Sequence, residues 1–289
     1  MTPLSLYEAL EERIDPADPA DRAAADALAQ VLARAVDPHR PDRFPSDELR
    51  ALLRGPIGAQ ITPVAQGGAL VWDRLLRVCG RLAAHDPDLT LCLGGVVLGA
   101  VPVIVAGTEA QRVRFFGRLR GGALACLAVS EWEHGSDLLS GQTVATRLPD
   151  GGFRLDGAKR PTNNGSVAHA VVVLARTGAL GDPFGGTLFL LERGHAGLLP
   201  ERAVDWSGCP QMDLSGVRLE GLVAGPEAVL GKVGEGFVAV RRALEITRSG
   251  VAGMALGAHA AAWAQAFAHA RERVLYGGPI ADLGGVRAL

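Results

Sequence analysis

The stretch LAVSEWEHGSDLLSG, residues 127–141, places three carboxylates and one imidazole within seven positions. These side chains are Glu131, Glu133, His134 and Asp137. Such a density fits a metal site, an acid–base pair, or charges that only shape a turn. A metal site is disfavoured, because the four residues are close together and no distant His or Asp partner is evident. The function of this cluster therefore depends on the sequence around it.

The composition of the chain is that of an ordinary globular protein. It has 289 residues, of which 48% are hydrophobic, and a formal net charge of −2. Without a global basic field, nucleic-acid binding is disfavoured. The first residues are acidic and lack an apolar signal core, so we expect a cytoplasmic protein. The four cysteines form no C-x-x-C pair and are expected to be buried small hydrophobic residues: Cys79, Cys92, Cys126 and Cys209.

The longest apolar run is LTLCLGGVVLGAVPVIVAG, residues 89–107. Its length and lack of charge also suit a transmembrane helix, so that alternative stays open. Polar, helix-like segments flank it and no second span is present. We therefore expect a buried core helix that breaks near Pro102, and no membrane span.

The pattern of apolar residues changes twice along the chain. Residues 1–120 are predicted to be helical, with helices over 19–36, 69–85 and 107–119. Asp86 or Asp88 is the expected N-cap of a further helix, and Thr108 with Gln111 matches a capping box.

From 121 to 226 the pattern becomes that of strands. ALACLAVSE predicts a buried strand, and TVATRLPDGGFRLDGAKRP predicts two strands joined by a tight turn. AHAVVVLART, GTLFLLERG and MDLSGVRLEGLVAGP predict three more. Residues 227–289 return to helix, with one long helix that begins at Phe237 and that the Gly277–Gly278 pair and Pro279 are expected to end. The small residues of this helix allow close packing. The predicted fold class is α+β, with domains over 1–120, 121–226 and 227–289.

This order, with a strand that runs into S-E-x-x-x-G-S-D, resembles the acyl-CoA dehydrogenase family of flavoproteins. Further matching stretches are FRLDGAKRPTNNG (153–165), VLGKVGEGF (229–237), ITR (246–248) and AHARERVLYGGPIADLGGV (268–286). The resemblance covers nearly the whole chain. It implies an N-terminal helical domain, a central β-barrel or sandwich, and the start of a C-terminal helical bundle. It also implies an oxidoreductase that uses FAD.

The resemblance implies a set of residues for the FAD site. In the family, the segment from Leu127 to Ser136 cradles the flavin ring, Gly135 lets the backbone approach, and Ser136 also meets the thioester substrate. The implied cofactor-binding residues are Leu127, Val129, Ser130, Gly135, Ser136, Pro161, Thr162, Asn163, Arg273 and Tyr276. Arg273 and Tyr276 would reach the flavin of a neighbouring subunit. The alternative for this segment is a β-turn whose serines bond their own backbone.

The resemblance reassigns the charges of the opening stretch. Glu131 is expected to be a structural hydrogen-bond acceptor, and Asp137 is expected to satisfy backbone donors in the turn. Glu133 occupies a variable loop position. His134 stays an open question, because an imidazole titrates near neutral pH.

The sequence departs from the family pattern in ways that affect function. Pro161 stands where the family usually has a tryptophan, and Asn163 where it usually has Thr or Ser. Thr247 occupies one of the two positions of the catalytic glutamate, and the other position lies beyond Leu289. Gly284 replaces a glutamine. No catalytic residue is therefore assigned within the chain. Either a second helical polypeptide supplies the base, or the sequence is a shortened one.

We therefore expect FAD-dependent α,β-dehydrogenation of an acyl-CoA or of an acyl group on a carrier protein. Ser136, Glu245 and Arg248 are the expected substrate-binding residues, and a homo- or hetero-oligomer, dimer or tetramer, is the expected assembly. Two alternatives stay open. One is a non-catalytic subunit of a heteromeric complex, and the other is a flavin-dependent oxidase or hydroxylase on the same fold.

Overall fold

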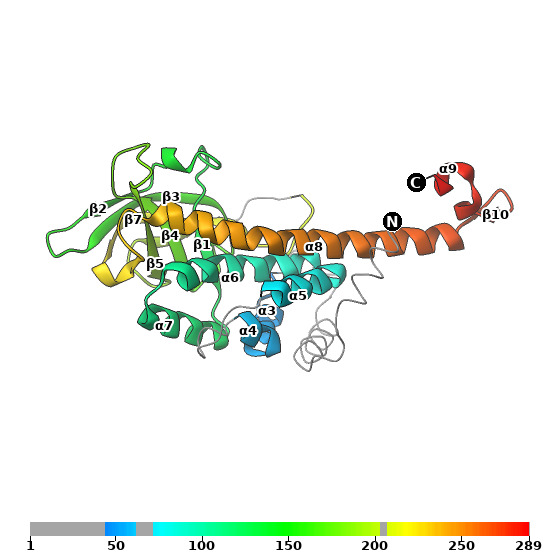
Figure 1. The fold of residues 1–289 in the computed structure, drawn as a ribbon, viewed down its shortest axis with the longest axis horizontal. Helices are drawn as coiled ribbons and strands as arrows, with labels where there is room; N and C mark the ends of the chain where they lie inside the picture. The colour runs from blue at the N-terminus through cyan, green and yellow to red at the C-terminus, as the bar shows by residue number, and fades with distance from the viewer. Residues whose placement is uncertain (1–43, 62–71, 203–206, 289) are drawn as a thin grey trace.

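The computed structural model describes residues 44–61, 72–202 and 207–288 (Figure 1). The helix expected over 19–36 lies outside these residues. The helices that precede the sheet are α3 (Ser46–Arg54), α4 (Pro56–Ile61), α5 (Trp72–His85), α6 (Pro87–Ala106) and α7 (Glu109–Arg120).

Two of these helices begin at the predicted caps. The Asp86 carboxylate accepts a hydrogen bond from the Leu89 amide at 2.9 Å and so caps α6. At α7, the Gln111 amide donates to Thr108 Oγ1 at 3.2 Å, and the Thr108 amide donates to Gln111 Oε1 at 2.9 Å. Both predictions are confirmed. Such caps can be predicted from sequence because they depend on residues within one turn of each other.

Helix α6 is the apolar run 89–107, and it packs between the other helices and the sheet (Figure 1). By length and composition alone it is long enough to cross a membrane, yet 67% of its most apolar window is buried inside the protein. The expected break near Pro102 is wrong, since the helix continues to Ala106. A proline this close to the end removes a single backbone bond, which the buried packing of the helix outweighs.

The strands form one large sheet in the order β6-β7-β3-β2-β4-β5-β8, with β1 pairing in parallel with β4. Strands β6 (LLPE) and β8 (VL) are absent from the sequence-based prediction, because β6 contains a proline and β8 has only two residues, so neither shows a strand pattern. The strands are β1 (Ala125–Ala128), β2 (Val144–Arg147), β3 (Phe153–Asn163), β4 (Ala170–Arg176), β5 (Gly186–Glu192), β6 (Leu198–Glu201), β7 (Leu214–Ala224) and β8 (Val229–Leu230). Short 3-10 turns lie at Leu138–Ser140 and Pro226–Ala228.

Both faces of the sheet are buried. In β4, Val172 and Leu174 join the core that the helices share, whereas Val171 and Val173 join a second core within the strands. Because neighbouring side chains on a strand point to opposite faces, one strand contributes to both cores. The sheet therefore carries the helical layer on one side and its own interior on the other.

The C-terminal part is dominated by α8 (Gly236–Glu272), whose first half packs on α5 and α6 (Figure 1). The close packing predicted for its small residues is seen at Gly253 and Gly257, where an added Cβ would collide with the backbone of α5 at Leu76 and Gly80.

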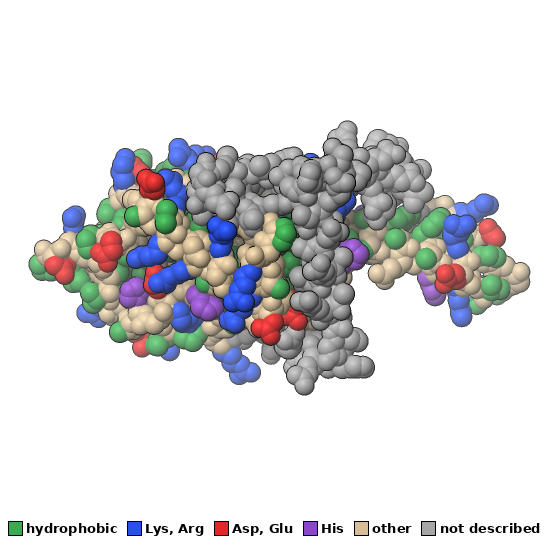
Figure 2. All heavy atoms as spheres, turned by 90° about the horizontal axis from the view of Figure 1, so that it is seen from below, with side chains coloured by type: hydrophobic (Ala, Val, Ile, Leu, Met, Phe, Trp, Pro, Cys, Tyr) green, Lys and Arg blue, Asp and Glu red, His purple; other side chains and the backbone are tan. Residues whose placement is uncertain are grey.

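The second half of α8 projects away from the body and ends in β9 (Val274–Leu275), β10 (Gly278–Pro279), a 3-10 turn (Ile280–Asp282) and α9 (Gly284–Arg287). The helix ends at Glu272, earlier than expected, because Tyr276 and Gly277 have left-handed φ angles of 55° and 87° in the turn that follows. Hydrophobic and charged side chains are interspersed over this projecting end (Figure 2).

Candidate active site

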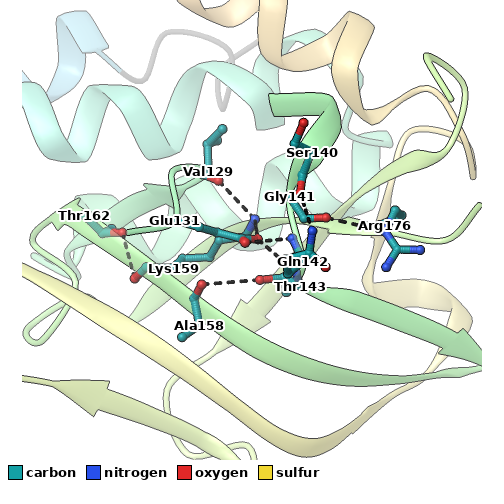
Figure 3. A network of polar contacts seen from close by, with 10 residues as sticks. All are labelled: Val129, Glu131, Ser140, Gly141, Gln142, Thr143, Ala158, Lys159, Thr162 and Arg176. Carbon is teal, nitrogen blue, oxygen red and sulfur yellow. Dashed lines mark hydrogen bonds and ion pairs between the residues drawn. The ribbon is translucent and has the colours of Figure 1, made fainter. Parts of the chain in front are cut away.

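The two segments expected to hold the cofactor lie side by side. The loop that follows β1, residues 129–137, runs along the last residues of β3 (Figure 3). The Arg160 amide donates to the Ser130 carbonyl at 2.9 Å, and Lys159 Nζ donates to the Val129 carbonyl at 3.0 Å. A stretch near residue 130 is thereby fixed to one near residue 160.

A buried ion pair strengthens this junction. Lys159 Nζ lies 2.8 Å from Glu131 Oε1, and the two side chains are only 3% and 9% exposed. Glu131 also accepts hydrogen bonds from the amides of Gln142, at 2.7 Å, and Thr143, at 2.9 Å. The structural role expected for Glu131 is confirmed: its carboxylate joins the loop, the segment that enters β2, and β3 (Figure 3).

The ion pair shifts the pKa of both groups. Burial alone raises the pKa of Glu131, but the hydrogen bonds from Lys159, Gln142 and Thr143 outweigh it and lower the pKa to about 2. Burial lowers the pKa of Lys159, and the bond to Glu131 opposes that effect. A carboxylate with so low a pKa is a poor proton acceptor near neutral pH, so Glu131 is unsuited to general-base chemistry.

The remaining charges of the opening stretch do not converge on one point. His134 Nδ1 lies 2.7 Å from Asp137 Oδ2, and the hydrogen bond lowers the pKa of Asp137. Asp137 thus bonds a side chain as its main partner, rather than the backbone donors expected. Glu133 is exposed to solvent. Among the described residues, no group of three or more His, Cys, Asp or Glu side chains could hold a metal ion.

The small and hydroxyl residues of the loop face open space. An added Cβ at Gly135 would meet nothing within 4 Å, so no packing within the described chain requires a glycine there. The hydroxyls of Ser130 and Ser136 make no hydrogen bond to another described residue, so the turn alternative gains no support from them. These groups remain available to a ligand.

The end of β3 presents its side chains in different directions. Pro161 is exposed, whereas Thr162 is 2% exposed and its hydroxyl lies 3.4 Å from the Lys159 carbonyl. Asn163 is half-buried and lines a cavity. Of the predicted set, Asn163 and Pro161 therefore reach the surface of the site, and the Thr162 side chain faces the interior.

Asn164 fixes the position of Asn163. It is fully buried with a left-handed φ of 61°, its amide donates to the Asp213 carbonyl at 2.7 Å, and Nδ2 donates to the Cys92 carbonyl at 2.8 Å. An added Cβ at Gly95 on α6 would lie 2.5 Å from Asn164 Nδ2. The end of β3 is therefore anchored to α6, and only glycine on α6 permits that approach.

A second polar cluster, which sequence reasoning missed, clamps the same turn. The Asp213 carboxylate accepts hydrogen bonds at 2.9 Å from Ser166 Oγ, the Ser166 amide and Ser215 Oγ. Arg193 donates to the carbonyls of Gly165, at 2.8 Å, and Ala168, at 2.9 Å. No motif could have shown this cluster, because residues that bond each other within it, such as Ser166 and Ser215, are as far as 49 positions apart.

An apolar cavity of about 80 Å³ lies between α5, α6 and α8, with Asn163 of β3 at its boundary. Leu76, Gly94, Thr247 and Met254 are among the residues that line it, and no ionisable carboxylate, imidazole, ammonium or guanidinium does so. The Thr247 hydroxyl donates to the Ala243 carbonyl at 3.1 Å. The cavity is therefore suited to an apolar group that ends beside a polar amide.

Four further predicted residues lie elsewhere. Glu245 is exposed and pairs with Arg241 at 3.2 Å, and Arg248 is exposed; neither is among the residues that line the cavity. Arg273 and Tyr276 lie just beyond the end of α8, and Tyr276 is 94% exposed in the turn between β9 and β10. Their assignment to substrate and cofactor binding stays a prediction.

The cysteines behave as expected in three positions. Cys79, Cys92 and Cys126 are buried. Burial raises the pKa of Cys79 and of Cys126 to about 12, and it also raises the pKa of Cys92. Cys209 is partly exposed. The three buried thiols are thus unsuited to nucleophilic or redox roles.

Comparison with known proteins identifies the family. Residues 126–222 match the model "Acyl-CoA dehydrogenase, middle domain", and residues 234–289 match "Acyl-CoA dehydrogenase, C-terminal domain". The chain is 33% identical over 202 residues to a short-chain specific acyl-CoA dehydrogenase of Megasphaera elsdenii, covering 69% of this chain and 53% of that protein. It is 30% identical over 271 residues to a cyclohex-1-ene-1-carbonyl-CoA dehydrogenase of Geobacter metallireducens, and this match covers 90% of this chain and 69% of that protein. The chain thus spans about half to two thirds of the length of these relatives.

The fold comparison agrees. The butyryl-CoA dehydrogenase from Megasphaera elsdenii superposes with a TM-score of 0.82 at 25% identity, covering 92% of this chain and 72% of that one. The prolyl acyl carrier protein oxidase AnaB shares the fold, with a TM-score of 0.85 at 22% identity. The superposition covers 94% of this chain and 74% of AnaB. These matches confirm the α+β fold class predicted from the sequence. The chain belongs to the acyl-CoA dehydrogenase family.

Proposed function

We propose that this chain binds FAD between the loop 129–137 and the end of β3, and that it takes part in the α,β-dehydrogenation of an acyl thioester. One observation carries the proposal. The apolar cavity between α5, α6 and α8 has Asn163 at its boundary, and Asn163 belongs to the segment expected to hold the flavin. A site for an apolar chain and a site for a cofactor therefore share one residue.

The residues of the loop fit a flavin. Gly135 leaves space where any other residue would place a Cβ, and the Ser130 and Ser136 hydroxyls are free of other described residues. The Asn163 amide can donate and accept at the edge of a heterocycle. Ser130, Gly135, Ser136 and Asn163 would hold the ring, together with the backbone of Leu127 and Val129.

The cavity provides binding and exclusion of water. Its apolar lining favours a saturated acyl chain over water, and Gly94 of α6 and Met254 of α8 lie close together in that lining. Bound FAD would accept the hydride that leaves the β-carbon while a base removes the α-proton. The protein itself orients the two reacting carbons and keeps water from the reaction.

The base does not come from the described lining of the cavity. Thr247 lies there, but its hydroxyl is already bonded to the Ala243 carbonyl, and a hydroxyl has no useful basicity at neutral pH. We propose that the carboxylate is supplied from outside this lining, by another part of the polypeptide or by a partner chain.

A second copy completes the cofactor site in this proposal. Arg273 directly follows the last residue of α8, and Tyr276 follows β9. Figure 1 shows that this end of α8 projects away from β1 and β3, between which the loop 129–137 lies. The Arg273 guanidinium suits the phosphate oxygens of FAD when it is presented by a neighbouring copy. We therefore expect a dimer or a larger oligomer.

The test is anaerobic titration of the purified full chain, with any co-encoded partner, by acyl-CoA and by acyl-carrier-protein thioesters. The proposal predicts a yellow protein whose flavin absorbance disappears when the correct thioester is added. Bound flavin that no thioester reduces would instead support the non-catalytic subunit. Peroxide release under air would support the oxidase. A protein that takes up no FAD would overturn the proposal.

A further inference from the structure

Trp132 is an exposed aromatic side chain in the middle of the loop 129–137. It is 67% exposed, and it is the only Phe, Tyr or Trp within the segments Leu127–Ser136 and Pro161–Asn163. A large aromatic ring left in water forgoes the burial that normally stabilises it. Exposed aromatic rings beside polar groups are typical of ligand-binding surfaces.

The Trp132 ring packs against the guanidinium group of Arg160. The guanidinium carbon of Arg160 lies 5.1 Å from the centre of the Trp132 ring, within the range of a cation–π contact. The Arg160 amide in turn donates to the Ser130 carbonyl at 2.9 Å. Trp132 is thus coupled to the end of β3 as well as to its own loop.

The backbone on both sides of Trp132 is also fixed. The Glu131 amide donates to the His134 carbonyl at 2.8 Å, and the His134 amide donates to the Glu131 carbonyl at 3.1 Å. The buried bond between Glu131 and Lys159 anchors the residue that precedes Trp132. The exposed ring therefore stands on a well-anchored turn.

Arg160 has an unmet hydrogen-bonding capacity. Its Nε atom is covered from solvent, yet it has no acceptor among the described residues. A buried donor without a partner costs free energy, which a ligand or a rearrangement of the stack would recover. The exposed aromatic ring and the unpartnered donor beside it therefore mark the same place as a ligand contact.

We propose that Trp132, positioned by Arg160, forms the outer wall of the flavin site and lies against the isoalloxazine ring. The inference rests on the proposed binding of FAD between the loop and β3. It assigns to Trp132 the shielding of the ring from solvent and oxygen, and to Arg160 the positioning of the indole. Pro161, which is exposed on the neighbouring strand, has no aromatic ring with which to do this.

The test uses the FAD-loaded full chain and compares Trp132→Phe, Trp132→Ala and Arg160→Gln with wild type. An indole in contact with a flavin quenches its emission, and a phenyl ring does not. We therefore expect the fluorescence of bound flavin to rise severalfold in Trp132→Phe, while access of iodide to the flavin stays low. In Trp132→Ala, fluorescence and iodide access both rise, and FAD binds about tenfold more weakly because one stacking contact is lost. Arg160→Gln raises the fluorescence in part, because the indole is no longer held.

Trp263→Phe is the matched control. Trp263 lies on α8 and stacks on Phe267 with ring centres 6.5 Å apart, so its replacement is expected to leave flavin fluorescence unchanged. Bound flavin with the same emission and iodide access in wild type and all three test variants would overturn the inference, while FAD binding itself would stand. Failure of wild type to bind FAD would overturn both, and circular dichroism identifies any variant that has unfolded, in which case Trp132→Phe alone decides.

Discussion

Lys159 Nζ and Glu131 Oε1 lie 2.8 Å apart in the interior, and they join the loop after β1 to the end of β3. The Glu131 carboxylate accepts hydrogen bonds from Lys159 and from two backbone amides of the segment that enters β2. The pair explains how neutral residues such as Ser130 and Asn163, far apart in the sequence, are held in one site. The charged residues of the opening stretch thus support the site and do not carry its chemistry.

Removal of the lysine tests that role. Lys159→Met leaves the Glu131 carboxylate buried without its charged partner, which is expected to cost about 3 kcal/mol of unfolding free energy. Urea denaturation measures this. Lys232→Met is the matched control, since Lys232 pairs with Glu235 at 3.4 Å on the surface and is expected to change stability by less than about 1 kcal/mol. Equal effects of the two substitutions would contradict the role of the buried pair.

The same carboxylate predicts a pH dependence of stability. The folded-state pKa of Glu131 is about 2, below the ordinary value of 4.5, so the unfolded chain binds more protons between these values. The stabilisation is complete above about pH 4.5 and is lost as the pH falls toward 2, by about 3 kcal/mol in total.

Glu131→Gln should flatten this acid limb of the stability curve, because an amide at this position does not titrate. The measurement is the urea denaturation midpoint of both proteins at a series of pH values between about 3 and about 6. An acid limb as steep in Glu131→Gln as in wild type would show that other carboxylates dominate it.

Asn164 supplies a third prediction. Asn164→Ala removes the bond to the Cys92 carbonyl and places a less tolerant residue at a left-handed φ, at a combined cost of about 2–3 kcal/mol. Asn164→Gly restores the backbone freedom, so it should be less destabilising than Asn164→Ala by about 1 kcal/mol. Thermal unfolding of both variants measures the difference, and the reverse order would contradict the strain at this position.

The cavity supplies a fourth. Met254 lies across from Gly94, where an added Cβ would be 3.0 Å from its Cε, and both residues line the cavity. Met254→Ala should enlarge the cavity and shift kcat/KM toward longer acyl chains, with a stability loss near the low end of about 2 kcal/mol for such truncations. Met254→Leu keeps the volume and is the control. An unchanged chain-length profile in Met254→Ala would separate this cavity from substrate binding.

Sequence patterns predicted local features well. The caps at Asp86 and Thr108 and the β2–β3 hairpin depend on residues within a few positions, so the sequence was sufficient. Two predictions were wrong. Burial keeps α6 helical past Pro102 as far as Ala106, and the turn after Arg273 ends α8 at Glu272.

Features made by distant residues escaped prediction. The bond between Lys159 and Glu131 spans 28 positions, and the Asp213 cluster has no motif. One signal was present: Lys159 follows Phe153 and Leu155 at even spacing, so it lies on the face of the strand that those two apolar residues bury, and a lysine there indicates a buried partner. The role of Trp132 does not follow from the sequence, because periodicity does not distinguish an exposed aromatic residue from a buried one.

The most direct test of the central claim is FAD binding by Gly135→Ala. The added Cβ meets nothing within 4 Å in the described chain, so folding and oligomeric state should match wild type. If the flavin lies against this loop, the methyl group occupies its space, and visible flavin absorbance after gel filtration should fall severalfold. Gly117→Ala, on α7 and also free of neighbours within 4 Å, should retain the wild-type flavin content. Wild-type flavin content in a folded Gly135→Ala protein would contradict the placement of the cofactor between the loop 129–137 and β3.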